Sequence, residues 1–313
     1  MTPVRMAVIG AGQFGKNHLR VIRSLDRAQL VAAVDADADR AAAAAQQFEC
    51  EALTDVAALE GRIDAAVIAA PTIAHADLAC RLLAMGIDVL IEKPIAPTLE
   101  DARRITGAAT SRIVQVGHLE QFNPAVLALR KMVTIPLFFE VHRLSLFTPR
   151  SLDVDVVLDL MIHDIDILLA LTGKLPEEIR AAGISILSRK VDIANVRLAF
   201  PGGCVANLTA SRVSTEQVRK LRLFQPHQYV SLDYSKQEIA VFGVSPAKQI
   251  GFIPTVVEKQ EPLRLELEAF LDCVINRSQP LVTAAQATLA LQVSLEILAK
   301  IEEHSRIVAQ SLQ

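Results

Sequence analysis

Residues 4–15 read VRMAVIGAGQFG, a short apolar run that leads directly into the pattern Gly10-x-Gly12-x-x-Gly15. Apolar residues then recur at helical spacing over Lys16–Leu25, so the pattern lies between a predicted strand and a predicted helix. In that setting the first glycine permits a tight turn, the second lets a pyrophosphate approach the backbone, and the third lets helix and strand pack closely. The helix N-terminus adds free N–H groups that favour phosphates. The stretch predicts a dinucleotide-binding β-α-β unit whose cofactor residues include Gly10, Gly12, Gln13, Phe14 and Gly15.

Asp35 indicates which dinucleotide is bound. It follows the predicted strand Leu30–Val34 and lies 35 − 15 = 20 residues beyond Gly15, where a carboxylate can accept hydrogen bonds from the adenosine ribose. The same carboxylate repels the 2′-phosphate of NADP, and Arg40, the one cation nearby, is expected to face solvent. We therefore expect NAD rather than NADP. A glycine turn that binds nothing is the alternative, and the position of Asp35 argues against it.

Strands and helices alternate from here to about residue 118. The predicted strands are Ala65–Ala70, Val89–Ile91 and Ile113–Gly117, and the predicted helices are Arg40–Phe48, His75–Met85 and Leu99–Gly107. Because each strand is almost continuously apolar, we expect a parallel sheet covered by helices on both faces. Ligands lie at the carboxyl ends of the strands in such sheets, and Glu92-Lys93-Pro94 follows one of these ends. Lys93 is therefore predicted to point toward a nicotinamide, rather than to be an ordinary surface lysine.

The pattern changes after residue 118. Predicted strands follow one another at Phe138–Leu144, Ile184–Leu187, Val196–Phe200, Cys204–Ala210, Arg222–Phe224 and Ile239–Phe242. Helices are expected at Asn123–Met132, Val156–Leu171, Leu263–Val274 and Ala284–His304. Strands joined by tight turns suggest a mainly antiparallel sheet. The chain is thus predicted to be α/β, with a dinucleotide-binding domain in residues 1–118 and a second domain in residues 119–313.

Composition narrows the classes of function. The 32 Lys and Arg residues against 35 Asp and Glu give a net charge of −3, which leaves no excess of cations to bind nucleic acid. The longest apolar runs, such as Ala65–Pro71, are far shorter than the ~20 residues that cross a membrane, and residues 1–10 do not resemble a signal peptide. The four cysteines are at least 30 residues apart and are expected to be packing thiols. We expect a reduced, cytoplasmic protein.

The predicted helix Val156–Leu171 carries a polar stripe. Asp159 and His163 lie four residues apart on one face, and Asp155 and Asp166 extend that face. A solvated helix face is the ordinary interpretation, but the apolar residues around the stripe leave little room for solvent, so we expect it to line a cleft. Two residues at this spacing are weak evidence for a metal site, and the pair His163-Asp164 alone is too little for an HD-type hydrolase. No metal is expected.

Taken in order, these motifs resemble the Gfo/Idh/MocA oxidoreductases, the relatives of glucose–fructose oxidoreductase and inositol dehydrogenase. The resemblance covers nearly the whole chain and is carried by Gly10–Gly15, Ala70–His75, Glu92–Pro94, Val116–Pro124, Asp159–Asp166 and Glu261–Phe270. It implies an amino-terminal Rossmann domain, a carboxy-terminal α/β domain on a large open sheet, and homodimers or homotetramers packed through that sheet. It also implies a tightly held nicotinamide cofactor and a sugar, cyclitol or nucleotide-sugar substrate. Pro71, Thr72, His75, Glu92 and Lys93 then join the cofactor-binding residues.

The resemblance implies a catalytic set of Lys93, Asp159 and His163. Oxidation of an alcohol needs hydride departure and removal of the hydroxyl proton; a histidine, with an ordinary pKa of about 6.5, suits the base. Lys93 can stabilise a developing alkoxide, and Asp159 can orient the imidazole or bind a neighbouring hydroxyl. A non-catalytic NAD-binding sensor, the alternative of another class, is expected to have lost at least one of the three.

One segment of the chain differs from the usual sequence of the family, and it indicates the subgroup of substrates. Where many relatives carry an Arg-rich run, this chain has His118-Leu-Glu-Gln-Phe-Asn123-Pro124, whose contacts the sequence leaves open. This form resembles the subgroup that oxidises UDP-N-acetylated sugars, including UDP-N-acetylglucosamine at its 3-hydroxyl. Inositol, free-sugar and diol dehydrogenases of the same family remain alternatives. Arg143 and Arg150 could bind a diphosphate or be ordinary surface arginines.

Overall fold

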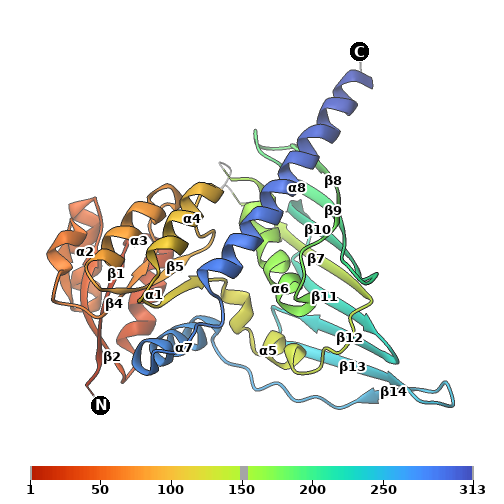
Figure 1. Ribbon diagram of the computed structural model, residues 1–313, viewed down its shortest axis with the longest axis horizontal. Coiled ribbons are helices and arrows are strands. Elements are labelled where there is room, and N and C mark those ends of the chain that lie inside the picture. Colours follow the sequence, from red (N-terminus) through yellow and green to blue (C-terminus); the bar gives the residue numbers. More distant parts are fainter. Residues whose placement is uncertain (1, 149–153, 312–313) are drawn as a thin grey trace. The chain divides into compact units, whose positions relative to one another are not determined.

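The computed structural model describes residues 2–148 and 154–311, which divide into two compact units (Figure 1). Unit 1 contains Met1–Leu119 and Glu261–Thr288, and unit 2 contains Glu120–Gln260 and Leu289–Gln313. No helix within the described ranges is long and apolar enough to cross a membrane.

Unit 1 is built on a six-stranded sheet of order β3-β2-β1-β4-β5-β6, whose strand pairings are all parallel. The strands are β1 (Val4–Ile9), β2 (Ala28–Val34), β3 (Glu51–Leu53), β4 (Ala65–Ile68), β5 (Asp88–Glu92) and β6 (Val114–Gly117). The helices between them are α1 (Gln13–Arg23), α2 (Ala38–Phe48), α3 (His75–Ala84) and α4 (Leu99–Ala108). This is the parallel sheet that the sequence predicts. Only β3 was not predicted, since its three residues are largely exposed and form no apolar run.

Unit 1 is completed by a helix that follows unit 2's sheet in the sequence. Helix α7 (Pro262–Asn276) buries Leu267, Phe270 and Leu271 in the same core as Leu19 and Ile22 of α1 and the apolar residues of β1, β4 and β5. The backbone after it also joins the sheet, because Val116 donates a hydrogen bond to Val282. The predicted division assigned residues 119–313 to one domain, whereas Glu261–Thr288 groups with unit 1. The physical reason is that α7 covers apolar sheet surface beside α1.

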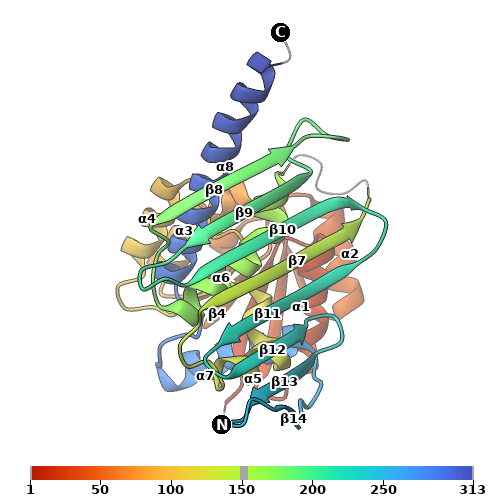
Figure 2. The ribbon, with the colours of Figure 1, turned by 90° about the vertical axis from the view of Figure 1, so that its right-hand side faces the viewer.

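Unit 2 contains an eight-stranded sheet of order β14-β13-β12-β11-β7-β10-β9-β8 (Figure 2). Its neighbours are antiparallel except β7 and β10, which confirms the predicted, mainly antiparallel sheet. The strands are β7 (Phe138–Leu146), β8 (Glu178–Ile184), β9 (Ile193–Ala199), β10 (Val205–Ser214), β11 (Val218–Gln225), β12 (Gln228–Asp233), β13 (Glu238–Val244) and β14 (Ile250–Ile253).

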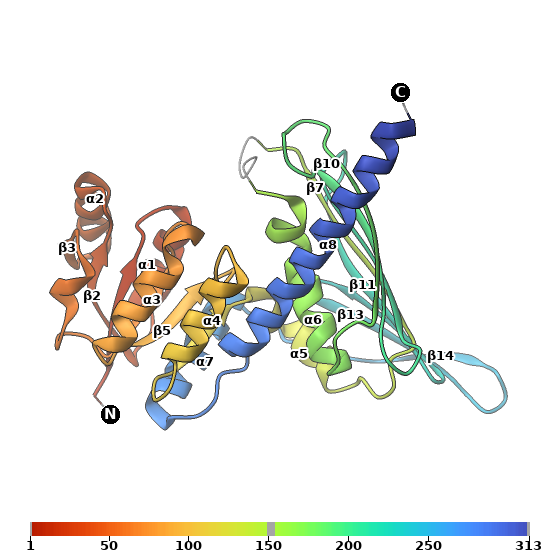
Figure 3. The same cartoon turned by 45° about the horizontal axis from the view of Figure 1, so that its top comes forward.

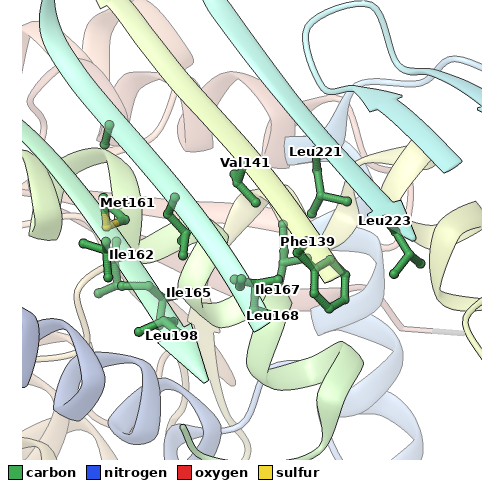
Figure 4. Packing of buried hydrophobic residues seen from close by; sticks show 14 of the residues in the cluster. Phe139, Val141, Met161, Ile162, Ile165, Ile167, Leu168, Leu198, Leu221 and Leu223 are labelled. Carbon is green, nitrogen blue, oxygen red and sulfur yellow. The ribbon is translucent and has the colours of Figure 1, made fainter. Parts of the chain in front are cut away.

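Helices cover one face of this sheet. They are α5 (Pro124–Arg130), the short π-helical turn η4 (Val157–Met161), α6 (Ile162–Thr172) and the part of α8 (Ala284–Ser311) in unit 2, which lie on the same side in Figure 3. Figure 4 shows Met161, Ile162, Ile165 and Leu168 against buried strand residues such as Phe139. The opposite face is turned to the viewer in Figure 2, and no described helix of unit 2 lies over it.

One predicted strand is wrong. Residues Ile184–Leu187 were expected to be extended, but β8 ends at Ile184 and a turn follows. The buried carboxylate of Asp192 forms that turn by accepting hydrogen bonds from the N–H groups of Ile186, Leu187 and Ser188. Burial would raise the pKa of Asp192, but these hydrogen bonds outweigh it and lower the pKa to about 2.

Candidate functional site

The three glycines of the first loop occupy three different environments. Gly10 has φ +97°, and a Cβ there would lie 2.5 Å from the carbonyl oxygen of Ala69. A Cβ on Gly15 would lie 1.7 Å from the carbonyl oxygen of Gly10, so α1 can start this close to β1 only with glycine. A Cβ on Gly12 would meet no described atom within 4 Å. The protein itself therefore does not require glycine at position 12, and the open space beside it fits a pyrophosphate.

A pocket of about 690 Å³ lies at the carboxyl ends of the unit 1 strands. Among the predicted cofactor residues, it is lined by Gly10, Gly12, Gln13, Phe14, Asp35 and Pro71. Phe14 is 64% exposed, so its ring is accessible to a ligand in the pocket. The residues fit a dinucleotide in size, in the open glycine turn and in the carboxylate at the end of β2. Gly15, Thr72, His75, Glu92 and Lys93 do not line this pocket.

Asp35 links the glycine loop to the end of β2. Its carboxylate accepts hydrogen bonds from the N–H of Ala11 at 2.8 Å and of Asp37 at 2.9 Å, and Arg40 lies 3.1 Å from it. Burial would raise the pKa of Asp35, but the two backbone N–H groups and Arg40 outweigh it and lower the pKa. Asp35 is therefore ionised at neutral pH and holds the turn that the cofactor would contact.

Arg40 is exposed as the sequence predicted, but it also belongs to the pocket. It was expected to face solvent, and its side chain is 61% exposed, but it pairs with Asp35 and lines the pocket. Arg81, which pairs with Asp55 at 2.7 Å, also lines the pocket and was not predicted. The sequence signal for Arg81 was its spacing of three residues from Leu78, which places both on one side of α3.

The residue before Lys93 is held by a histidine that the sequence did not single out. Glu92 accepts a hydrogen bond from His18 of α1 at 2.7 Å, and its other oxygen accepts one from the N–H of Lys93. Burial would raise the pKa of Glu92, but the hydrogen bond to His18 and the charges of His18 and Lys93 outweigh it and lower the pKa. Glu92 thus fixes the backbone that presents Lys93, at the carboxyl end of β5.

Two further side chains of unit 1 are buried near this segment. Both ring nitrogens of His75 face carbonyl oxygens, Nδ1 of Pro94 at 3.0 Å and Nε2 of Ala70 at 2.9 Å, and burial lowers its pKa. His75 therefore ties the loop after β4 to the loop after β5. The carboxyl group of Glu266 on α7 is fully buried and has no hydrogen-bond partner within the described ranges. Burial and the charge of Glu92 raise its pKa well above the usual value.

In unit 2 the predicted polar stripe divides into two parts. Asp155 accepts a hydrogen bond from the N–H of Val191, and buried Asp166 accepts one from Gln121 at 2.6 Å. Each of these two carboxylates thus has a hydrogen-bond partner inside unit 2. Asp159 and His163 remain as the candidate pair, both partly buried. Asp159 belongs to the π-helical turn η4 and His163 to the first turn of α6, a break in helix geometry that is frequent at functional sites.

The sequence suggested that Arg143 is either a diphosphate ligand or an ordinary surface arginine, and the structure agrees with neither. It is buried, with Nε and Nη2 donating to Asp164 at 2.7 and 2.8 Å and Nη1 donating to Glu120 at 2.9 Å. Its guanidinium also lies 4.8 Å above the ring of Tyr234. Arg143 is therefore a structural residue with no donor pattern left for a diphosphate. The same network engages Asp164, which removes the basis for an HD-type hydrolase.

Asn123 also serves the fold. Its side chain caps α5 by accepting from the N–H of Ala125 and donates to the carbonyl of Tyr234. Arg150 lies outside the described residues.

Two family models match the chain. The oxidoreductase family with an NAD-binding Rossmann fold matches residues 4–118, and the GFO/IDH/MocA C-terminal domain matches residues 140–228.

Individual proteins resemble the chain over nearly its whole length. The UDP-N-acetylglucosamine 3-dehydrogenase of Acidithiobacillus ferrooxidans is 33% identical over 311 residues, which cover 96% of this chain and 98% of that enzyme. The scyllo-inositol 2-dehydrogenase (NAD(+)) of Bacillus subtilis is 27% identical over 326 residues, covering 93% of this chain and 92% of that enzyme. A solved structure of the A. ferrooxidans enzyme matches with a TM-score of 0.91 at 32% identity, over 97% of this chain and 99% of that chain.

Proposed function

The chain belongs to the Gfo/Idh/MocA family of NAD-binding oxidoreductases, and from that premise we propose that it oxidises a secondary alcohol of a nucleotide sugar. The leading substrate is UDP-N-acetylglucosamine, oxidised at its 3-hydroxyl. The observation that carries this choice is the 33% identity, over 96% of the chain, to an enzyme named for that reaction. The glycine loop, Asp35 and the pocket around them support the cofactor half of the proposal.

The catalytic residues of the proposal are Lys93, Asp159 and His163. Bound NAD would supply the hydride acceptor. His163 accepts the hydroxyl proton, and Lys93 stabilises negative charge on the substrate oxygen as the proton leaves. Asp159, one helical turn before His163, orients the imidazole or binds a neighbouring hydroxyl. The hydrogen bonds of Glu92 to His18 and to the N–H of Lys93 support this role, because they fix the backbone from which the lysine extends.

Pro71, Thr72, His75 and Glu92 stay in the proposal as residues of the cofactor site. His75 and Glu92 act there by holding the loops after β4 and β5, as their hydrogen bonds indicate. Pro71 lines the pocket directly.

The experiment that tests the function is a substrate panel. Purified protein is incubated with NAD and, in turn, UDP-N-acetylglucosamine, UDP-glucose, free N-acetylglucosamine, myo-inositol and scyllo-inositol, and NADH absorbance is followed. We expect the highest kcat/KM with UDP-N-acetylglucosamine, and a product lacking two hydrogens by mass spectrometry. Preference for an inositol would replace the proposed substrate, and binding of NAD without turnover on any alcohol would favour the sensor.

We also propose that the chain forms homodimers or homotetramers in the cytoplasm. The support is an aromatic row on the uncovered face of the unit 2 sheet, where the facing rings lie 4.9–5.8 Å apart between centroids. The row consists of Phe138, Phe224, Tyr229, Phe242 and Phe252. Light scattering after gel filtration tests the assembly, and a monomer at micromolar concentration would contradict it. All four cysteines are free thiols, which agrees with a reducing compartment.

A further inference from the structure

Two arginines stand directly opposite each other in the unit 2 sheet. Arg219 of β11 is paired in register with Arg143 of the antiparallel strand β7. Side chains of directly paired residues project from the same face, with Cβ atoms about 5 Å apart. Because Arg143 is buried on the helix-covered face, Arg219 projects from that face too. Like charges at this spacing destabilise a sheet, so the pair requires an explanation.

Among the described residues, neighbouring carboxylates form hydrogen bonds with only one of these two arginines, Arg143. Asp164 accepts two hydrogen bonds from Arg143, and Glu120 accepts a third at 2.9 Å. Those carboxylates are oriented toward Arg143 by α6 and by the segment before α5. Arg219 feels the charges of Glu120, Asp164 and Asp159, but its side chain makes no hydrogen bond or ion pair within the described ranges.

The Arg219 side chain is also partly withdrawn from water. Its Nε is fully buried without a partner, and the side chain is only partly exposed. Burial and the charge of Arg143 both lower its pKa. A partly buried guanidinium without an acceptor loses part of its hydration, and perturbed charged groups of this kind cluster at functional sites. A ligand suited to this guanidinium carries negative charge on neighbouring oxygens, which an arginine binds in a bidentate manner.

We propose that Arg219 binds the diphosphate of the nucleotide-sugar substrate. This assignment rests on the proposed function. Arg219 lies opposite Arg143, whose partner Asp164 directly follows His163 in α6, so a substrate that reaches His163 lies near the Arg219 side chain. It gives Arg219 the role that the sequence suggested for Arg143. It also predicts the substrate class, since inositols and free sugars carry no anion for this residue.

The test measures binding of UDP to NAD-saturated protein by calorimetry, so it does not depend on turnover. The variant is Arg219→Met, which keeps the length of the side chain and removes the charge. The matched control is Arg222→Met on the same strand, whose side chain pairs with Glu140 at 2.8 Å on the opposite face. We expect UDP to bind about 10- to 100-fold more weakly to Arg219→Met, the usual effect of losing one charge-assisted pair, and equally well to the control.

Thermal unfolding distinguishes a ligand-binding arginine from a structural one. Arg219→Met should unfold at the same or a higher temperature than the wild type, because the variant lacks a partly buried charge that faces the charge of Arg143. A lower unfolding temperature together with unchanged UDP affinity would show that Arg219 is structural. Absence of UDP binding to the wild type would also overturn the assignment. The proposed function fails separately, if UDP binds through Arg219 but UDP-N-acetylglucosamine is not oxidised.

Discussion

Lys93 is the residue whose replacement separates cofactor binding from chemistry. It lies outside the pocket that the glycine loop lines, so Lys93→Met should leave NAD affinity nearly unchanged. Turnover should fall by about 100-fold or more, because one positioned positive charge at the substrate oxygen is lost. Calorimetry measures the NAD affinity, and initial rates at saturating NAD measure the turnover. Lys131→Met, at the exposed end of α5, is the control, and near-normal turnover in Lys93→Met would remove Lys93 from the catalytic set.

His163 should set the acidic limb of the pH–rate profile. A general base must be neutral to accept a proton, so oxidation should decline as pH falls through the imidazole pKa. We expect His163→Asn to be strongly impaired and to lack that limb, while Asp159→Asn shifts the limb without abolishing it. The profile is measured at saturating NAD, with a deuterium isotope effect to show that hydride transfer limits the rate. An unchanged limb in His163→Asn would identify another base, with Lys93 as the next candidate.

We expect Asp35 to make the protein bind NAD more tightly than NADP, even though Arg40 is close. The carboxylate is ionised and its pKa is lowered, so it repels a 2′-phosphate at all pH values above its own titration. We expect calorimetry to give tighter binding of NAD(H) than of NADP(H). Asp35→Asn should narrow that difference, because the 3.1 Å pair with Arg40 is then weakened and the cation becomes available to a phosphate. Equal affinities in the wild type would contradict the expectation.

At the scale of elements, α7 carries an acid whose titration affects stability. Burial and the charge of Glu92 raise the pKa of Glu266 in the folded chain. The folded state therefore keeps a proton that the unfolded state loses above about pH 4.5, and this contribution to stability declines as pH rises toward the folded pKa. Glu266→Gln cannot ionise, so relative to the wild type it should gain about 2 °C or more in unfolding temperature between pH 5 and pH 8.

The control for that prediction is Glu268→Gln, two residues along the same helix. Glu268 is partly exposed and pairs with Arg264 at 2.9 Å, so its replacement should not produce the same pH-dependent gain. A constant difference between Glu266→Gln and the wild type across this range would show that Glu266 is ionised in the fold.

Helices and strands could be predicted from the sequence where the local spacing of apolar residues and glycines determines them. The alternation in β1, α1 and β2 depends on local apolar spacing and glycine, and it places the loop correctly. The turn after β8 could not be found, because it depends on a carboxylate at position 192 reaching back to residues 186–188. The π-helical turn that contains Asp159 was not predicted either, because a uniform α-helical period was assumed for the whole apolar segment.

At the scale of the molecule, the site residues that escaped prediction are those that depend on distant pairings. His18 gains its role from Glu92, and Arg219 from its register with Arg143. Their neighbours in sequence do not distinguish them from core or surface residues of the same type. The glycines and Asp35, in contrast, act through the backbone next to them, so their spacing alone was sufficient.

Unit 1 is formed by two separate segments of the chain, and this predicts how fragments of the protein behave. A fragment ending at residue 119 lacks α7, so the apolar surface that meets Leu267, Phe270 and Leu271 is left in water. We expect this fragment to bind a hydrophobic dye and to bind NAD weakly or not at all. The same fragment joined to residues 261–288 through a flexible linker should bind the dye less and recover NAD binding. Full NAD affinity in the shorter fragment would show that α7 is dispensable.

The return of α7 to unit 1 also has a consequence for biosynthesis. The ribosome completes residue 119 long before residue 276, and 276 − 119 = 157 residues must be translated between them. At about 5–20 residues per second this takes about 8 to 30 s. During that interval the nascent Rossmann sheet has an uncovered apolar face while the strands of unit 2 emerge beside it. A chaperone that holds nascent chains would therefore meet this protein early, and codon changes that slow translation between residues 119 and 261 would lengthen the exposure and lower the yield of folded enzyme.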